Sequence, residues 1–321
     1  FTDYSNNPVA VHSGQGRDPH LFWFAPAHCW VMAVYDDAGG NGVQFYSTPD
    51  FHTWTYGSKL YNGFFECPDM FQLPVDGNPS NLMWVLNDAS GGYQLGQFDG
   101  TNFTPGTTKL PGNNGNGFYA SQTFTGMAPG DDRKVRIGWA ILGMPGMPFN
   151  QAMFFPTALS LNTTSNGVRL CSLPVAEWTN NILNTYVWTN LTLNTGVNPL
   201  AGLRGANFEL QAVFNPGPVG TLNCVLNGVA ITYDAAARQI TVNGNTQSLP
   251  PINGTVTLEL LGDRQMLEIF GNGGQLYMPL AGMPYDPANK LVSLTSSGAS
   301  FSFKSLRVCP LRSAWTQPVK P

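Results

Sequence analysis

Short apolar segments alternate with clusters of Gly, Asn, Asp and Pro from about residue 18 to residue 172. The clusters at 36–42, 76–79 and 111–117 are typical of tight turns, and the segments between them are rich in β-branched and aromatic residues. This pattern predicts antiparallel strands joined by hairpins. The expected strands include residues 21–24, 30–35, 43–47, 82–86, 93–98 and 135–140.

The pattern changes at residues 173–190, which we interpret as a linker. Beyond it, alternating apolar and polar positions with regular turn spacing predict a β-sandwich. Its expected strands include residues 208–214, 239–242, 256–261 and 267–270. No long stretch has helical periodicity, so we expect an all-β chain with one domain over residues 1–172 and a second over 191–321.

The composition indicates a globular protein that acts on neutral partners. Of the 321 residues, 42% are hydrophobic and 12% aromatic, which is ample for a packed core. A net charge of −4, scattered basic residues and no apolar run of membrane-spanning length argue against nucleic-acid and membrane partners. The five cysteines and four histidines lack metal-ligand spacing, so neither a metal nor a cofactor is expected.

Two acids, Glu66 and Asp69, stand three positions apart inside the apolar run 64–71. A carboxylate among apolar side chains has a raised pKa, which suits a general acid, so Glu66 is a candidate proton donor. The alternative is a strand end with two solvated acids. Cys67 lies between them, and we expect it to pack behind the acids without a catalytic role.

Asp18 lies beside a proline at the start of a second aromatic run, with Arg17 next to it. We expect the arginine to keep Asp18 ionised. An acid at the start of a hydrophobic strand, recurring at this spacing, is typical of propeller blades whose first strands line a central channel. The two acidic motifs are therefore expected to meet.

The two motifs resemble the paired R-D-P and E-C-P-D motifs of glycoside hydrolase family 32, the family of invertases, levanases and inulinases. Arg17-Asp18-Pro19 matches the first motif and Glu66-Cys67-Pro68-Asp69 the second. The resemblance continues in order through nearly the whole chain. The further similar stretches are 118–124 (F-Y-A-A-Q-T-F in the family), 137–139 (I-G-W), 146–151, 155–161, 267–274 and Leu311-Arg312-Ser313-Ala314-Trp315.

This resemblance implies a five-bladed β-propeller, with about four blades present here, followed by a C-terminal β-sandwich. It also implies a retaining β-fructofuranosidase activity on levan, inulin or sucrose. The implied roles are Glu66 as acid/base, Asp18 as transition-state stabiliser that binds fructose hydroxyls, Arg17 and Asp69 as sugar-binding neighbours, and Trp139, Phe118 and Tyr119 as sugar-stacking side chains. For these three aromatic residues, packing between blades is an equal alternative.

The family's nucleophile lies in a W-M-N-D-P-N-G type segment upstream of the R-D-P motif, and residues 1–321 contain no such segment. The sequence starts at a stretch similar to the one before the second blade, so we expect the nucleophile-bearing blade to be absent from it. Asn6-Asn7-Pro8 has an asparagine in place of the nucleophile. Asp3, Asp36 and Asp88 are weak candidates for a replacement.

Two functions therefore remain open. One is a secreted fructan-active glycoside hydrolase of carbohydrate metabolism, and the other is a catalytically inactive remnant that binds fructan or serves structurally. A propeller that lacks a blade leaves open strand edges, so a second chain or segment is a candidate partner that covers them. The sequence begins without methionine, which indicates a processed chain or a fragment.

Overall fold

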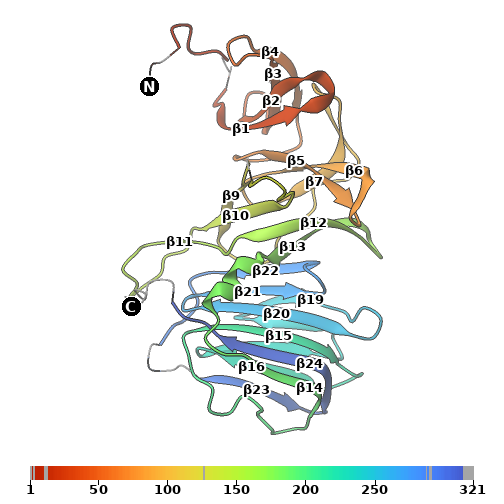
Figure 1. Cartoon of the computed structure of the whole chain (residues 1–321), viewed down its shortest axis with the longest axis vertical. Coiled ribbons are helices and arrows are strands. Elements are labelled where there is room, and N and C mark those ends of the chain that lie inside the picture. The colour runs from red at the N-terminus through yellow and green to blue at the C-terminus, as the bar shows by residue number, and fades with distance from the viewer. Residues whose placement is uncertain are drawn as a thin grey trace. The chain divides into compact units, whose positions relative to one another are not determined.

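The computed structural model describes residues 2, 4–10, 14–125, 127–286, 288 and 291–313. The contacts divide the chain into two compact units (Figure 1). Unit 1 comprises Phe1–Gly112, Phe118–Trp139 and Leu159–Leu170, and unit 2 comprises Asn113–Gly117, Ala140–Ala158 and Cys171–Pro321. The predicted boundaries at 172 and 190 stay a proposal.

The regular structure of unit 1 is almost entirely β, with one short 3-10 helix, η1 (Ala25–Ala27), among its described residues. The strands that lie wholly or mainly in this unit are β1 (Arg17–Phe24), β2 (Cys29–Asp36), β3 (Gly42–Thr48), β4 (Thr55–Leu60), β5 (Asp69–Val75), β6 (Asn78–Asn87), β7 (Tyr93–Phe98), β8 (Phe103–Pro105), β9 (Phe118–Thr123), β10 (Lys134–Ala140) and β12 (Thr157–Thr164). Strand β13 (Gly167–Pro174) is divided equally between the two units.

Two antiparallel four-strand runs repeat the same order in unit 1. Strands β1-β2-β3-β4 form one sheet, and β5-β6-β7-β8 follow each other in a larger sheet in which β12 pairs with β5 and β10 pairs with β12 (Figure 1). The turn before the outer strand is built alike in both. Asp50 accepts the N–H groups of His52 and Thr53, and Asp99 accepts those of Thr101 and Asn102. This repetition agrees with the predicted blades.

The core of unit 1 lies within and between these sheets. One buried cluster joins side chains of β1 to β3 with side chains of β5 to β8, including Val31, Phe45, Met70 and Phe98. A second cluster joins β5 to β7 with β12 and β13. Burial of these large apolar side chains supplies the main driving force for the sheets to pack.

Unit 2 holds the 3-10 helix η2 (Ala176–Asn181) and the remaining strands. They are β11 (Ala152–Met153), β14 (Tyr186–Leu193), β15 (Asn207–Asn215), β16 (Thr221–Leu226), β17 (Val229–Asp234), β18 (Gln239–Val242), β19 (Asn245–Ser248), β20 (Val256–Asp263), β21 (Met266–Gly271), β22 (Leu276–Leu280), β23 (Val292–Ser297) and β24 (Phe301–Pro310). Together with unit 1, they confirm the predicted all-β class.

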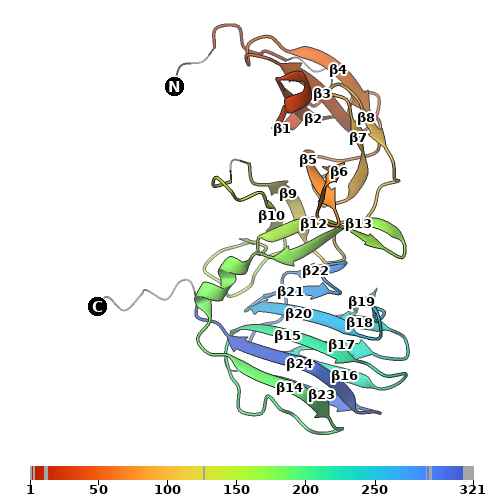
Figure 2. The same cartoon turned by 45° about the vertical axis from the view of Figure 1, so that its right-hand side comes forward.

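Two sheets of unit 2 lie as adjacent layers, one in the order β14-β24-β15-β20-β21-β22 and the other β19-β18-β17-β16-β23 (Figure 2). Their inward side chains form one buried cluster that includes Leu210 and Leu260 from the first sheet and Ile231 and Ile240 from the second. This arrangement is the predicted β-sandwich.

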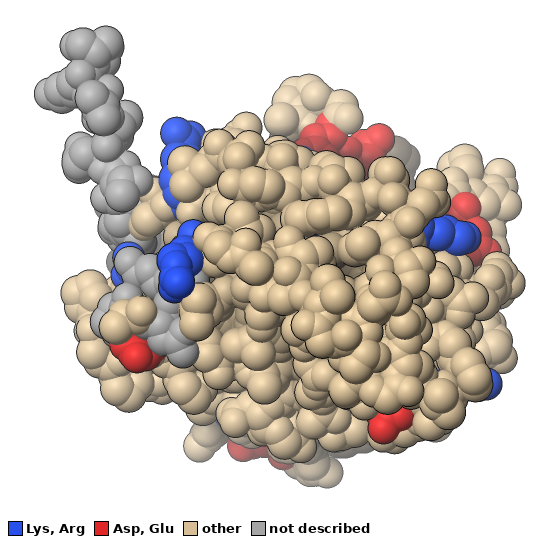
Figure 3. Space-filling view, turned by 90° about the horizontal axis from the view of Figure 1, so that it is seen from below, with Lys and Arg blue, Asp and Glu red and all other residues tan. Residues whose placement is uncertain are grey.

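The strand predictions from the sequence are confirmed. The expected segments 93–98 and 239–242 match β7 and β18 in full, and the other expected strands lie inside longer observed ones. The part of the surface seen in Figure 3 is mostly uncharged, with few and separated Lys and Arg side chains. No helix among the described residues is long and apolar enough to cross a membrane.

Candidate active site

Glu66 lies in the loop between β4 and β5, where two donors from distant parts of unit 1 reach its carboxylate. Arg17 donates from Nε to Oε1 over 2.9 Å, and its Nη2 lies 2.8 Å from the same oxygen. The hydroxyl of Tyr119 in β9 donates to Oε2. The side chain of Glu66 keeps 23% of its surface exposed, so it is held firmly and still open to solvent.

The pKa of Glu66 moves opposite to our expectation. The hydrogen bond from Tyr119 lowers it below the usual carboxyl value, burial opposes this, and the hydrogen bond and positive charge of Arg17 lower it further. The expectation of a raised pKa rested on the apolar neighbours in the sequence and was wrong. Phe65, the residue before Glu66, is 42% exposed. The groups that contact the carboxylate are the donors Arg17 and Tyr119.

Asp18 reaches the Glu66 loop from β1. The pairing of β1 with β2 shifts register between Arg17 and His20, and Asp18 lies in this irregularity with a φ of 57°. Its Oδ2 accepts the backbone N–H of Cys67 over 3.2 Å. A bulge at the start of a strand redirects a side chain, and here it joins the two motifs that the sequence predicted to meet.

Backbone strain is concentrated at this point. Asp18, Glu66, Cys67 and Ala120 all have φ between 44° and 57°, a region that residues other than glycine rarely adopt. Such conformations cost free energy and persist where the surrounding structure enforces them, often at functional sites. The carbonyl of Glu66 is fixed as well, since it accepts the N–H of Ala89 over 2.9 Å.

Asp69 is fully buried at the start of β5 and is occupied by protein donors. Its Oδ2 accepts the backbone N–H of Thr123 over 2.6 Å, and its Oδ1 lies 3.1 Å from both the Thr123 hydroxyl and Nε2 of His20. Asp69 therefore ties β5 to β1 and β9, the strands that carry Arg17, Asp18 and Tyr119. The resemblance implied a sugar-binding role, and the geometry is that of a structural clamp.

Arg17 makes its ion pair with Glu66, and the charge of Asp18 also acts on its guanidinium, so the expected effect of Arg17 on the ionisation of Asp18 stays a prediction. Its guanidinium lies 4.5 Å from the ring centroid of Tyr35 and 5.6 Å from that of Phe65. These contacts hold the guanidinium in the plane that reaches Glu66. Neither ring was predicted as a site residue. Tyr35 lies opposite Arg17 on the paired strand β2, and the sequence alone does not show this pairing.

The three predicted aromatic residues have different surroundings. Phe118 is buried against Gly138, where an added Cβ would lie 2.3 Å from the ring, and the guanidinium of Arg136 lies 5.2 Å from its centroid. Tyr119 uses its hydroxyl on Glu66. Trp139 is 37% exposed, so it alone among the three has the open surface that stacking on a sugar requires.

His20 and Thr123 were missed as site residues. His20 is 8% exposed, and its Nε2 contacts the carboxylate of Asp69. Strand alternation gave no signal, because the register shift between Arg17 and His20 breaks the alternation at Asp18. Nothing in the sequence pattern links Thr123 to Asp69 across 54 positions.

Two of the three candidate replacement nucleophiles, Asp36 and Asp88, are held in ion pairs. Asp36 is fully buried with its Oδ1 2.8 Å from Nζ of Lys59, and Asp88 is 2% exposed and paired with Lys109. Asp3 lies outside the described residues. Buried, paired carboxylates are poor nucleophiles because attack would strand the cation.

Cys67 follows Glu66 directly in the site. Burial raises the pKa of the Cys67 thiol to about 12, and the charge of Asp18 adds to this, so the thiol stays protonated. None of the five cysteines, all within the described residues, forms a disulfide. In the part of the chain that the structure describes, no group of His, Cys, Asp and Glu side chains is arranged to hold a metal ion.

Sequence profiles place this chain in a family. Residues 1–174 match the Glycosyl hydrolases family 32 N-terminal domain, and residues 179–310 match the Glycosyl hydrolases family 32 C terminal region. The chain therefore belongs to glycoside hydrolase family 32, as its motifs suggested.

Individual relatives agree. A levanase of Bacillus subtilis is 32% identical over 365 residues, an alignment that covers 98% of this chain and 53% of the levanase. An extracellular exo-inulinase of Aspergillus niger is 28% identical over 340 residues, covering 88% of this chain and 62% of the relative. The chain thus spans roughly half to two thirds of the length of these relatives.

Solved structures establish the fold. The exo-inulinase of Aspergillus awamori superposes with a TM-score of 0.81 at 21% identity, over 96% of this chain and 71% of the relative. A β-fructofuranosidase of Schwanniomyces occidentalis complexed with fructosyl-erythritol gives a TM-score of 0.81 at 19% identity, over 98% and 73%. The expected family fold, a five-bladed propeller with a C-terminal β-sandwich, is confirmed. Of the stretches that carried the resemblance, Ala314-Trp315 lies outside the described residues.

Proposed function

We propose that this chain is the catalytic part of a fructan-active glycoside hydrolase of the β-fructofuranosidase type, acting on levan, inulin or sucrose. The observation that carries the proposal is the position of Glu66, half-buried between Arg17 and Tyr119, with Asp18 bound to the amide of the next residue. The levanase and exo-inulinase relatives supply the substrate class.

In the proposed reaction, Glu66 protonates the oxygen that leaves fructose, and Asp18 stabilises the positive charge that develops on the ring. Once the proton has left, Arg17 and Tyr119 stabilise the carboxylate. The same carboxylate then takes a proton from the water that completes a retaining reaction. The lowered pKa of Glu66 in the free chain suits this second, general-base step.

A retaining mechanism also needs a nucleophile about 5–5.5 Å from the acid. We propose that a segment outside residues 1–321, or a second chain, provides this carboxylate and covers the open edge of the propeller. A second negative charge at that distance would raise the pKa of Glu66. With this carboxylate nearby, Glu66 would hold the proton that its first step requires.

The other assigned roles follow from exposure. Trp139 is proposed to stack on a sugar ring, and Arg17 to act through Glu66. Phe118 and Asp69 are proposed to position the site from within the protein, because both are buried. The chemistry requires no cofactor. A secreted location is proposed because an exo-inulinase relative is described as extracellular.

The test is fructose release from sucrose, inulin and levan by this chain together with the segment or chain that supplies the nucleophile, and by the same protein carrying Glu66→Gln. Loss of a general acid typically lowers the rate by about 10²–10⁴-fold, so we expect a fall of that size. Glu177→Gln, an exposed glutamate in η2, is the matched control and should keep full activity. Equal, measurable release by the parent protein and Glu66→Gln would refute the role of Glu66.

A second candidate function is fructan binding without hydrolysis. The lowered pKa of Glu66 favours it, because a carboxyl that stays ionised cannot donate a proton. In that case the chain would bind inulin or levan in an affinity gel and release no fructose from any of the three substrates.

A further inference from the structure

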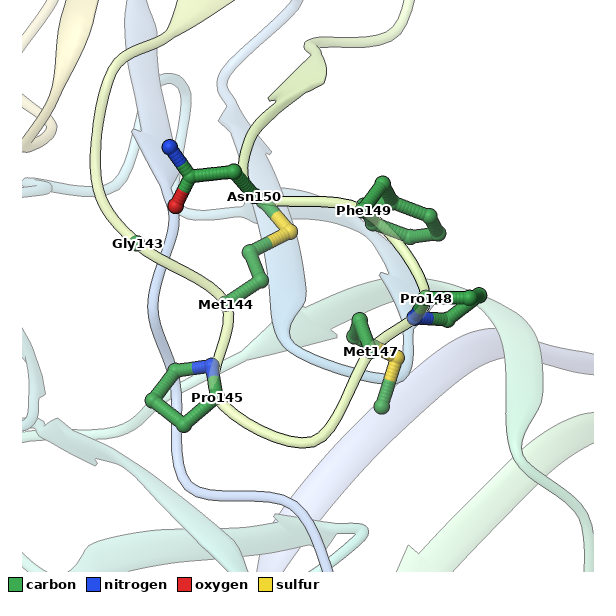
Figure 4. Close-up of a pocket in the computed structure, with 7 residues that line it drawn as sticks. All are labelled: Gly143, Met144, Pro145, Met147, Pro148, Phe149 and Asn150. Atoms are coloured by element: carbon green, nitrogen blue, oxygen red, sulfur yellow. The ribbon is translucent and has the colours of Figure 1, made fainter.

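Unit 2 contains a pocket of about 410 Å³ between residues 144–153 and the turn that joins β20 to β21. Its lining combines four methionines and one phenylalanine with a short polar group, Asp263-Arg264-Gln265. The same loop lines a second hollow of about 480 Å³, drawn in Figure 4. Both volumes fall in the range of small-ligand sites.

The loop that forms one wall is fixed in place. Nε2 of Gln265 donates to the carbonyl of Pro145 over 2.7 Å, and the N–H of Met144 donates to the carbonyl of Asn150 over 3.0 Å. Met144 is buried and anchors the loop, while Phe149 is 37% exposed and its ring projects from the outer side of the loop (Figure 4). The aromatic surface is therefore presented on a held backbone.

The opposite wall carries the guanidinium of Arg264 beside the carboxylate of Asp263. The guanidinium lies 3.9 Å from Sδ of Met147, and its charge acts on Asp263. Arg264 also has a φ of 50° in a two-residue turn, a position where glycine is usual. The Oε1 atom of Gln265 is buried and has no surface open to the pocket, so Arg264 is the polar group that a ligand can reach on this wall.

We propose that this pocket is a second carbohydrate site that binds one or two sugar units of a fructan chain. A sugar offers hydroxyls that accept from Arg264 and an apolar ring face that packs on Phe149. Asp263 beside Arg264 balances its charge, which favours a neutral ligand over an anionic one. The choice of fructan as the ligand rests on the proposed function, whereas the site shares no residue with the surroundings of Glu66.

Oxidative footprinting tests the proposal, because Met153 lines the pocket and is 49% exposed. The protein carries Glu66→Gln, so that hydrolysis cannot consume the probe, and the probes are short inulin and levan oligosaccharides. We expect saturating oligosaccharide to slow oxidation of Met153 to its sulfoxide severalfold. Arg264→Ala and Phe149→Ala should each abolish this protection.

Arg238→Ala is the matched control, since Arg238 is also an arginine with positive φ in a hairpin of unit 2 but lies outside the pocket. It should leave the protection of Met153 intact. Phe149 lies on an exposed loop, so its variant serves if Arg264→Ala fails to fold. Oxidation of Met153 at one rate with and without both oligosaccharides would overturn the proposal, whatever the outcome of the fructose-release assay.

Discussion

Asp69, the second acid of its motif, either binds sugar or holds the site together, and substitutions of this residue distinguish the two roles. Its buried carboxyl accepts the backbone N–H of Thr123, and the Thr123 hydroxyl and His20 reach it as well. Asp69→Ala leaves the Thr123 N–H and the His20 ring nitrogen without an acceptor. Each such buried group costs about 1–3 kcal/mol, so we expect the free energy of unfolding to fall by about 2–5 kcal/mol.

Asp69→Asn is the matched variant. Its carbonyl can accept the Thr123 N–H, and its amide can donate to the Thr123 hydroxyl and to the other tautomer of His20. We therefore expect it to lie within about 1 kcal/mol of the parent. Urea unfolding followed by tryptophan fluorescence measures both variants. Equal stability of all three proteins, together with weaker sugar binding by the variants, would refute the clamp and restore the sugar-binding role.

Three further predictions concern titration and ion pairing. Tyr119→Phe removes the hydroxyl that lowers the pKa of Glu66, so this pKa should rise in a carbon-13 NMR titration. Burial raises the pKa of Glu268 to about 7, so the folded chain loses stability as the pH rises from about 4 to about 7. Over this window Glu268→Gln should gain up to about 3 kcal/mol of stability relative to the parent, measured by urea unfolding. Lys59→Ala removes the cation that pairs with the buried carboxylate of Asp36 and should cost about 3–5 kcal/mol in the same unfolding assay.

The Lys59→Ala prediction has a control variant, and the other two predictions have outcomes that would contradict them. Asp131→Ala breaks a surface pair with Arg133 and should cost far less stability than Lys59→Ala, because solvent screens the surface pair. A stability difference between Glu268→Gln and the parent that stays constant with pH would contradict the burial argument. The Tyr119 argument fails if the titration of Glu66 is the same in both proteins.

The fold was predictable because its determinants are local. Turn clusters and apolar runs located strands such as β7 and β18 in full. Each of these signals spans only a few residues, so no long-range contact had to be known.

The candidate site was predictable only in part. The motifs placed Asp18 and Glu66 together, because a repeated blade pattern puts equivalent positions at one channel. The environment of Glu66 was misjudged, since its pKa depends on Tyr119, which lies 53 positions away and arrives from another strand. The burial of Asp69 was hidden for the same reason, because its partners lie on β1 and β9.

The most direct test of the central claim compares two substrates in the same pair of proteins. Sucrose has a poor leaving group that needs a proton, whereas p-nitrophenyl β-fructofuranoside has a leaving group that departs as an anion. If Glu66 is the general acid, Glu66→Gln loses kcat/KM on sucrose by about 10²–10⁴-fold and loses far less kcat/KM on the nitrophenyl substrate, because kcat/KM reports on the first step and not on the later attack of water. An equal loss of kcat/KM on both substrates, or no loss on sucrose, would contradict the assignment of Glu66.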